Sequence, residues 1–174
     1  MTRVVLSIGS NLGDRLARLQ SVVDSLGDAV RAVSAVYETD AWGGVEQGRF
    51  LNAVVIAEDP ALDAHGWLRR VQAIESANDR VRERKWGPRT LDVDLVCAAG
   101  PGGEVMCSDA DLTLPHPFAR ERAFVLMPWL DVDPAADITV DGRPRPVRDL
   151  LDELDQTERD GVRPTALTLS TGRG

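Results

Sequence analysis

Two aspartates, Asp92 and Asp94, are spaced in a way that suits the binding of divalent cations. They alternate with apolar residues over 90–98, a pattern that predicts a β-strand. Side chains alternate between the faces of a sheet, so both carboxylates should stand on one face, roughly 6–7 Å apart at Cα. Adjacent carboxylates repel unless a cation lies between them, and hard oxygen ligands suit Mg²⁺. The opposite face should carry the apolar residues that meet the helices, namely Leu91, Val93, Leu95 and Cys97.

A basic stretch directly precedes these aspartates. Within 80–89, Glu83 is the one negative residue against five positive ones, Arg80, Arg82, Arg84, Lys85 and Arg89, in a chain whose formal net charge is −8. Taken separately, an Asp-x-Asp pattern more often marks a solvated edge strand, and a charge run more often marks a solvated helix end. Together they favour a phosphate site, because cations hold phosphates and carboxylates hold the metal ions that bridge them.

Length and composition limit the fold and the partners. A chain of 174 residues, 43% of them hydrophobic, suits one domain, 1–174, with a core at about 1–154 and a polar tail at 155–174. We find no signal peptide and no apolar stretch long enough for a bilayer, which predicts a cytoplasmic protein without membrane contact. The acidic balance argues against nucleic-acid binding. Cys97 and Cys107 form no CxxC pair or Cys/His cluster in the sequence, which argues against structural zinc, and His65 is expected on the surface.

The elements that must position these residues follow from hydrophobic periodicity. Strands are expected at 4–8, 30–38, 50–57 and 90–98, and helices at 12–26 and 62–78, the first capped by Ser10 or Asn11. This order predicts an α+β fold with a ferredoxin-like βαββαβ core, an antiparallel sheet with helices on one face and the active-site cleft on the other. Further on, we expect a short strand at 104–106, a helix or strand at 123–130, a helix at 148–154 and a weak strand at 166–169.

Several motifs along the chain together resemble one enzyme family, the 6-hydroxymethyl-7,8-dihydropterin pyrophosphokinases of folate biosynthesis. The resemblance covers nearly the whole chain, and its motifs occur in the family's order and spacing. They are Ile8-Gly9-Ser10-Asn11-Leu12-Gly13, Tyr37-Glu38-Thr39, Phe50-Leu51-Asn52-Ala53, the segment from Lys85 to Val96, Leu112-Thr113-Leu114-Pro115-His116-Pro117 and Arg122-Ala123-Phe124-Val125-Leu126. The resemblance implies transfer of pyrophosphate from ATP, the co-substrate, to the hydroxymethyl group of the pterin.

The same resemblance assigns residues to roles. Asp92 and Asp94 would hold two Mg²⁺ ions, and the catalytic set would be Arg80, Arg82, Arg89, Asp92 and Asp94. Nucleotide contacts would come from Gln72, Glu75, Arg82, Arg89, Leu95, Thr113, His116 and Arg122. The pterin site would consist of Thr39, Asp40, Trp42, Phe50, Asn52, Trp86 and Phe124. In it, Trp86 and Phe124 would sandwich the planar ring and Asn52 would bind its edge, in keeping with the stacking area of aromatic rings and the donor and acceptor of an amide.

Some positions depart from the family pattern, and other functions stay open. Asp40 stands where proline is frequent, Trp42 where leucine is, and Phe50 where tyrosine is, while Asp111 replaces a basic residue. We expect a monomer that binds ATP and the pterin and no nucleic acid. The alternatives are a ferredoxin-like nucleotide- or RNA-binding module without turnover, and a different Mg²⁺-dependent transferase. An RNA-binding sheet should expose aromatic and basic residues rather than paired aspartates.

Overall fold

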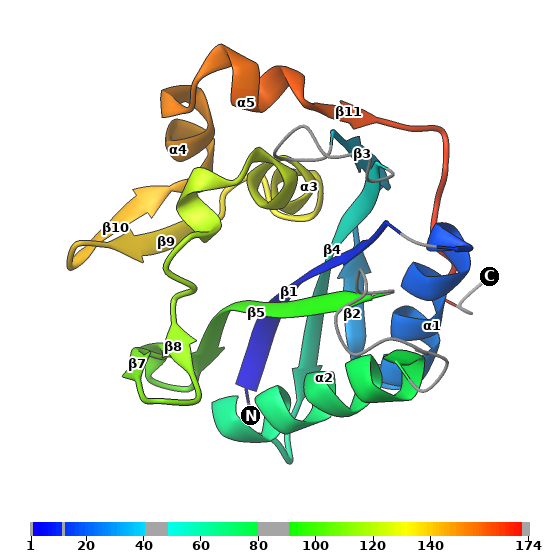
Figure 1. Ribbon diagram of the computed structural model, residues 1–174. Coiled ribbons are helices and arrows are strands. Elements are labelled where there is room, and N and C mark those ends of the chain that lie inside the picture. The colour runs from blue at the N-terminus through cyan, green and yellow to red at the C-terminus, as the bar shows by residue number, and fades with distance from the viewer. Residues whose placement is uncertain (1, 12, 41–48, 80–90, 172–174) are drawn as a thin grey trace.

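An antiparallel sheet forms the centre of the computed structural model, which describes residues 2–11, 13–40, 49–79 and 91–171 (Figure 1). Strand β1 (Thr2–Ser10) lies between β4 (Phe50–Asp59) and β5 (Asp92–Gly100) and pairs with both. β2 (Val30–Val33) and β3 (Tyr37–Thr39) both pair with β4. The order from β5 through β1 and β4 to β2 and β3 confirms the ferredoxin-like core.

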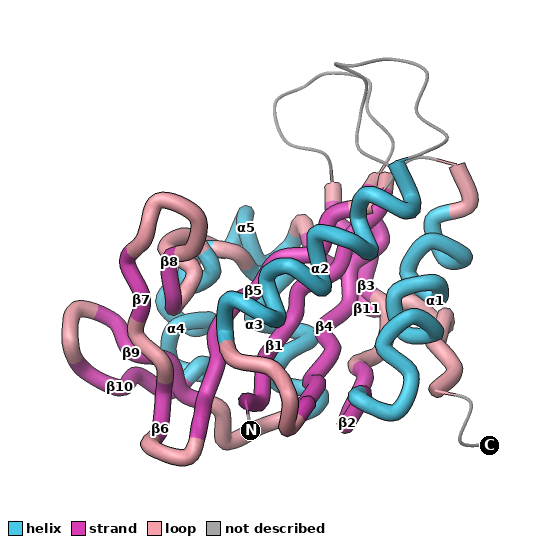
Figure 2. Tube along the Cα trace, turned by 90° about the horizontal axis from the view of Figure 1, so that it is seen from below, coloured by secondary structure: helices cyan, strands magenta, loops and turns pink. Residues whose placement is uncertain are grey.

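Helices α1 (Arg15–Leu26) and α2 (Ala64–Asp79) cover one face of this sheet, as expected (Figure 2). Their apolar side chains bury Leu6, Ile8 and Val55 of the sheet. The first helix begins later than the sequence suggested. Its N-cap is Asp14, whose carboxylate accepts a hydrogen bond from the backbone N–H of Ala17 at 3.1 Å, so the expected cap at Ser10 or Asn11 is wrong.

The second face of the sheet is covered over part of its length, by elements that the sequence analysis did not place there. Helix α3 (Ala123–Val132), the hairpin of β9 (Asp137–Val140) and β10 (Arg143–Pro146), and helix α4 (Val147–Glu153) pack against it. A short 3₁₀ turn, η2 (Ala119–Glu121), leads into α3. The resulting second core consists of sheet residues such as Val5, Val54, Ile56 and Val96 together with α3 and α4 residues.

A β-bulge in β5 changes the expected phase of that strand. Val5 pairs with Cys97 and Leu6 pairs with Leu95, so Val96 is an extra residue on β5. Leu91, Val93 and Leu95 face the helix-side core as predicted. Val96 and Cys97 instead lie against the second core, so the prediction that Cys97 shares a face with Leu95 is wrong.

The C-terminal segment, expected as a polar tail, runs back along the sheet edge. After helix α5 (Gln156–Asp160), strand β11 (Val162–Pro164) pairs with β3, whereas the weak strand expected at 166–169 is not formed. Gln20 on α1 holds Ser170 through two hydrogen bonds. The remaining strands are short: β6 (Gly103–Glu104) pairs antiparallel with the end of β5, and β7 (Cys107–Ser108) pairs with β8 (Thr113–Leu114). No helix in the described part of the chain is long and apolar enough to span a bilayer.

Candidate active site

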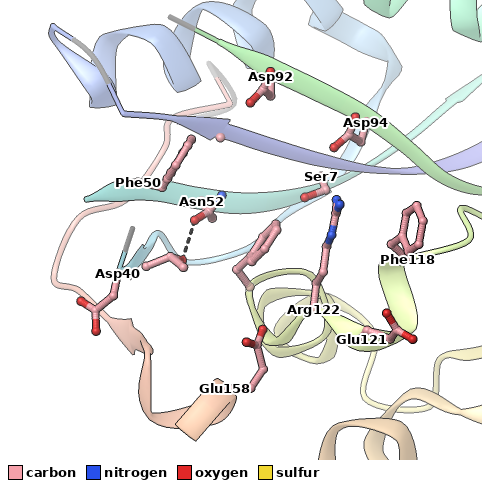
Figure 3. Close-up of a pocket in the computed structure, with 13 residues that line it drawn as sticks. Ser7, Asp40, Phe50, Asn52, Asp92, Asp94, Phe118, Glu121, Arg122 and Glu158 are labelled. Atoms are coloured by element: carbon pink, nitrogen blue, oxygen red, sulfur yellow. Dashed lines mark hydrogen bonds between the residues drawn. The ribbon is translucent and has the colours of Figure 1, made fainter. Parts of the chain in front are cut away.

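The candidate active site is a cavity of about 460 Å³ on the sheet face that α3 only partly covers (Figure 3). This volume lies in the range of small-molecule binding sites. Its floor begins where polar and small residues replace the apolar residues of the second core. Strand pairing aligns Asp92, Gly9 and Asn52 across β5, β1 and β4, and it places Asp94 beside Ser7. Residues paired on adjacent strands share a sheet face, so these side chains open into one space.

Asn52 is held in a fixed orientation at the base of the cavity. Its side chain is buried, and its Oδ1 accepts a hydrogen bond from the Thr39 hydroxyl at 2.6 Å. A Cβ atom at Gly9 would lie 2.6 Å from Asn52 Nδ2, closer than real Cβ contacts allow. Gly9 therefore makes room for the Asn52 amide. With Oδ1 bonded to Thr39, the amide N–H₂ group is the part suited to donate to a ligand.

The wall opposite the floor is made by the start of α3 and the turn before it. Arg122 lies between two aromatic rings, with its guanidinium carbon 5.6 Å from the centroid of Phe124 and 5.8 Å from that of Phe118. Both distances allow cation–π attraction. Phe118 is 54% exposed, and Figure 3 shows its ring and the Arg122 side chain extending toward the sheet. This wall offers one cation and two flat apolar surfaces.

The C-terminal segment completes the cavity at its outer side. Glu158 of α5 lines the cavity, and its carboxylate accepts a hydrogen bond from the backbone N–H of Ala123 at 3.2 Å. Helix α3 has no side-chain cap of its own, so Glu158 satisfies a donor at its first turn. Asp40 also lines the cavity and is bonded to Arg163 at 2.8 Å. That hydrogen bond lowers the pKa of the Asp40 carboxyl below its usual value.

Asp92 and Asp94 offer oxygen donors of the kind that Mg²⁺ prefers. Both are partly exposed, both line the cavity, and Figure 3 shows their carboxylates on the same side of β5. Among the described residues that line the cavity, Asp40, Asp92, Asp94, Glu121 and Glu158 are acidic and Arg122 is the one cation. Hard oxygen donors in a partly hydrated, acidic cleft are what Mg²⁺ prefers, particularly when phosphates complete its coordination.

His116 lies beside the cavity rather than in its lining. Its backbone N–H donates to the Val96 carbonyl at 2.8 Å, which holds the loop along the outer edge of β5. Burial lowers the pKa of His116 below its usual value, Asp94 opposes this lowering, and Arg122 adds to it. The imidazole is therefore near Asp94 and Arg122, and its burial favours the neutral form.

The structure brings together most of the described residues expected around the pterin, and fewer of those expected around the nucleotide. Thr39, Asp40, Phe50, Asn52 and Phe124 all line the cavity, as do Arg122 and the two aspartates expected to bind metal, Asp92 and Asp94. The other described residues predicted for the nucleotide, Gln72, Glu75, Leu95, Thr113 and His116, do not.

These remaining nucleotide residues lie around the outer edge of β5. Glu75 on α2 accepts a hydrogen bond from the Val93 backbone N–H at 3.2 Å, and Gln72 is exposed on the same helix. Thr113 is exposed in the β7–β8 hairpin. Leu95 is buried in the helix-side core, so its side chain does not face the cavity, and the nucleotide contact expected of Leu95 stays a prediction.

Other predicted site residues lie outside the part of the chain that the structure describes. They are Trp42 in 41–48 and Arg80, Arg82, Trp86 and Arg89 in 80–90. Of the two aromatic rings expected to sandwich the pterin, the structure therefore describes Phe124 and not Trp86.

Five residues of the cavity were missed by the sequence analysis: Ser7, Gly9, Phe118, Glu121 and Glu158. Ser7 and Gly9 alternate with the buried Leu6 and Ile8, so the strand phase that placed Asp92 could also have placed them. Glu121 directly precedes Arg122, which was predicted, and Phe118 lies four residues before it. No sequence pattern near Glu158 marks it as a site residue, because Glu158 is placed in the cavity by the way the C-terminal segment folds back along the sheet.

Fold and cavity together define a class of protein. The chain is an α+β protein with a ferredoxin-like sheet, whose cavity combines paired aspartates with a fixed amide, aromatic rings and an arginine. Such a cavity can accept a flat polar molecule and a metal-bound phosphate group side by side.

Comparison with known proteins identifies the family. Residues 5–134 match the model of the 7,8-dihydro-6-hydroxymethylpterin-pyrophosphokinase (HPPK) family, and the chain belongs to this family. It is 60% identical over 168 residues to the 2-amino-4-hydroxy-6-hydroxymethyldihydropteridine pyrophosphokinase of Mycobacterium tuberculosis H37Rv, covering 94% of this chain and 89% of the relative. The protein of the same name from Mycobacterium leprae is 59% identical over 179 residues, covering 99% and 94%.

Solved structures agree at the level of the fold. The crystal structure of wild-type Plasmodium falciparum HPPK-DHPS with pteroate matches with a TM-score of 0.66 at 12% identity. The match covers 87% of this chain and 44% of the longer Plasmodium chain. At this identity the likeness supports the α+β fold alone.

Proposed function

We infer that this protein transfers pyrophosphate from ATP to 6-hydroxymethyl-7,8-dihydropterin in folate biosynthesis, giving the pterin diphosphate and AMP. Membership of the HPPK family and relatives of that name at 60% identity support this function. The structural observation that carries it is the shared cavity: Asp92 and Asp94 open into the same space as the Asn52 amide. A metal-bound phosphate and a pterin held there would be adjacent, as a transfer between them requires.

The proposed pterin position is at the Asn52 end of the cavity. The Thr39 hydroxyl fixes the orientation of the Asn52 amide, so Nδ2 can donate to an acceptor on the edge of the ring. Phe124 and Phe50 offer aromatic faces for stacking, and Trp86 is proposed as the second side of the sandwich. Arg122, Asp40 and Glu158 would then lie around the remaining edge of the ligand.

The proposed nucleotide position is along the outer edge of β5. Gln72 and Glu75 flank this edge from α2, and His116 and Thr113 flank it from the following loop. Arg80, Arg82 and Arg89 are proposed to neutralise the triphosphate, which the acidic cavity could not do with Arg122 alone.

In the proposed reaction a bond forms between the hydroxymethyl oxygen and the β-phosphorus, and the bond from that phosphorus to the α,β-bridging oxygen breaks. AMP leaves with the bridging oxygen, and the proton of the hydroxymethyl group is released to water. Asp92 and Asp94 are proposed to bind two Mg²⁺ ions, which when bound would neutralise charge on the phosphates and help to align them. The contribution of the other side chains is to hold the pterin in place and to exclude water.

The test measures AMP formed from ATP with and without 6-hydroxymethyl-7,8-dihydropterin. The proposal expects AMP only when the pterin and Mg²⁺ are both present. ATP binding without AMP formation would favour a nucleotide-binding module, and retention of RNA on a filter would favour an RNA-binding module.

We further propose a monomer that acts in the cytoplasm on small molecules and binds no nucleic acid, in keeping with the formal net charge of −8. Analytical ultracentrifugation checks the oligomeric state.

A further inference from the structure

Three side chains that commonly bind metals converge away from the cavity, on the helix side of the sheet. His65 lies in the first turn of α2, Cys107 lies in β7, and Asp109 follows β7 directly. Cys107 packs against the helix-side core, and the chain leading to it is bonded to the far end of β5 through Val105 N–H and the Ala98 carbonyl. Figure 1 shows the β7–β8 hairpin beyond the end of β5 that is opposite to the start of the strand at Asp92. The cluster is thus separate from the two cavity aspartates.

The ligand atoms of the three residues are already close together. His65 Nε2 lies 2.8 Å from Asp109 Oδ2, Cys107 Sγ lies 3.5 Å from the same oxygen, and all three atoms lie within 4.8 Å of one another. Tetrahedral zinc with ordinary bond lengths keeps its ligand atoms about 3.3–3.8 Å apart. Small side-chain rotations would therefore bring the three atoms to coordination distance.

Two ordered elements hold these residues. Cys107 and Asp109 are two residues apart at the end of a hairpin that the Asp109 N–H closes by donating to the Leu112 carbonyl at 2.9 Å. The start of α2 is fixed by Asp63, which accepts from the Gly66 N–H at 2.7 Å. His65 and Asp109 are 44 residues apart in sequence, which is why the sequence pattern gave no Cys/His cluster. We expected no zinc site because the sequence contains no closely spaced Cys/His cluster. The fold brings distant residues together, so sequence spacing does not exclude a site here.

A plain hydrogen bond between His65 and Asp109 is the simpler interpretation of this contact. That interpretation leaves the Cys107 thiol without a role, although the Asp109 oxygen that accepts a hydrogen bond from His65 also accepts one from Cys107. A metal ion would take the place of the thiol proton and bind the sulfur, the imidazole nitrogen and the carboxylate oxygen together. The imidazole and carboxylate are 42% and 55% exposed, so an ion can enter from solvent.

We propose that His65, Cys107 and Asp109 form a second metal site, which binds zinc or a similar divalent transition metal with water at the fourth position. Thiolate and imidazole ligands favour such metals, whereas Mg²⁺ favours the all-oxygen ligands of Asp92 and Asp94. The bound ion would link the β7–β8 hairpin to α2. Within the part of the chain that the structure describes, this is the one group of three such side chains close enough to share an ion.

The test titrates Co²⁺ into the metal-free full chain in the presence of excess Mg²⁺, which occupies oxygen-only sites. We expect one Co²⁺ per chain with the visible bands of tetrahedral cobalt and a thiolate-to-cobalt charge-transfer band in the near ultraviolet. Zn²⁺ should displace the cobalt and raise the melting temperature. Cys107→Ser should remove the charge-transfer band, and Asp109→Asn and His65→Gln should each weaken binding by at least ~10-fold.

Two controls make the result decisive. Asp111→Asn makes the same charge change in the same hairpin without touching the three ligands, and it should leave Co²⁺ affinity unchanged. Cys97→Ala should retain the charge-transfer band. The proposal is wrong if the unmodified chain gives no such band, or if the band survives Cys107→Ser. It is also wrong if Asp109→Asn and Asp111→Asn bind cobalt equally well, and this comparison does not depend on Cys107→Ser folding.

Discussion

Substitution of Gly9 by alanine should weaken pterin binding while leaving the sheet intact. The new Cβ would lie 2.6 Å from Asn52 Nδ2, about 0.8 Å short of ordinary van der Waals contact, which begins at 3.4 Å. The backbone of Gly9 is not in the left-handed region, so alanine itself is tolerated there. The amide of Asn52 must therefore move, and the 2.6 Å hydrogen bond from Thr39 must lengthen or break.

The expected size of the effect follows from this displacement. A misplacement approaching 1 Å at a positioning residue can cost up to about 100-fold, so we expect the Kd for the pterin to rise roughly 10- to 100-fold. Loss of the Thr39 hydrogen bond in a buried position should also lower the free energy of unfolding by roughly 1–3 kcal/mol.

Isothermal titration of the pterin in the presence of a non-hydrolysable ATP analogue measures the Kd directly. Gly102→Ala is the matched control, because its Cβ would meet nothing within 4 Å and Gly102 is remote from the cavity in the β5–β6 turn. A Kd for Gly9→Ala within twofold of the unmodified protein would refute the assignment of Asn52 to the pterin site. Equal losses in both variants would refute the steric argument.

Three further predictions concern Tyr37, Cys97 and Glu158. The sequence has one tyrosine, Tyr37, whose pKa is raised by burial and by its hydrogen bond to Asp131. The folded state thus keeps a proton that the unfolded state loses above about pH 10, so stability should fall more steeply with rising pH beyond that value in the unmodified chain than in Tyr37→Phe; urea unfolding at several pH values checks this. Burial raises the pKa of the Cys97 thiol to about 12, so Cys97 in a Cys107→Ser variant should react with a thiol reagent only after unfolding, and rapid reaction of the folded protein would contradict this. Glu158→Ala should lower the free energy of unfolding by roughly 0.5–2 kcal/mol, because the backbone N–H of Ala123 at the start of α3 loses its hydrogen-bond acceptor. Glu158→Gln keeps an acceptor oxygen and should lower the free energy of unfolding by less. Equal decreases in both variants, measured by urea unfolding, would contradict the capping role.

The sequence was sufficient for the features that depend on regular alternation. Asp92 and Asp94 lie on the cavity side of β5 because their strand is regular as far as Leu95. The same reasoning failed at Cys97, because one extra residue at the bulge reverses every later side chain. Periodicity has no means of detecting such an insertion.

Features that depend on distant segments could not be read from the sequence. Glu158 enters the cavity because β11 pairs with β3, and a three-residue strand of Val162, Arg163 and Pro164 has too little pattern to be detected. The layer formed by α3 and α4 was missed for a related reason, since an apolar run at 123–130 fits a helix or a buried strand equally well.

AMP formation by Asp94→Ala tests the central claim most directly. The Asp94 side chain is partly exposed on the floor of the cavity, so its removal should leave the fold and the melting temperature nearly unchanged. Asp111→Asn provides the control for loss of an exposed carboxylate elsewhere. We expect AMP formation at saturating ATP, pterin and Mg²⁺ to fall by at least ~100-fold in Asp94→Ala and to be unchanged in Asp111→Asn. Near-normal turnover in a folded Asp94→Ala variant would contradict it.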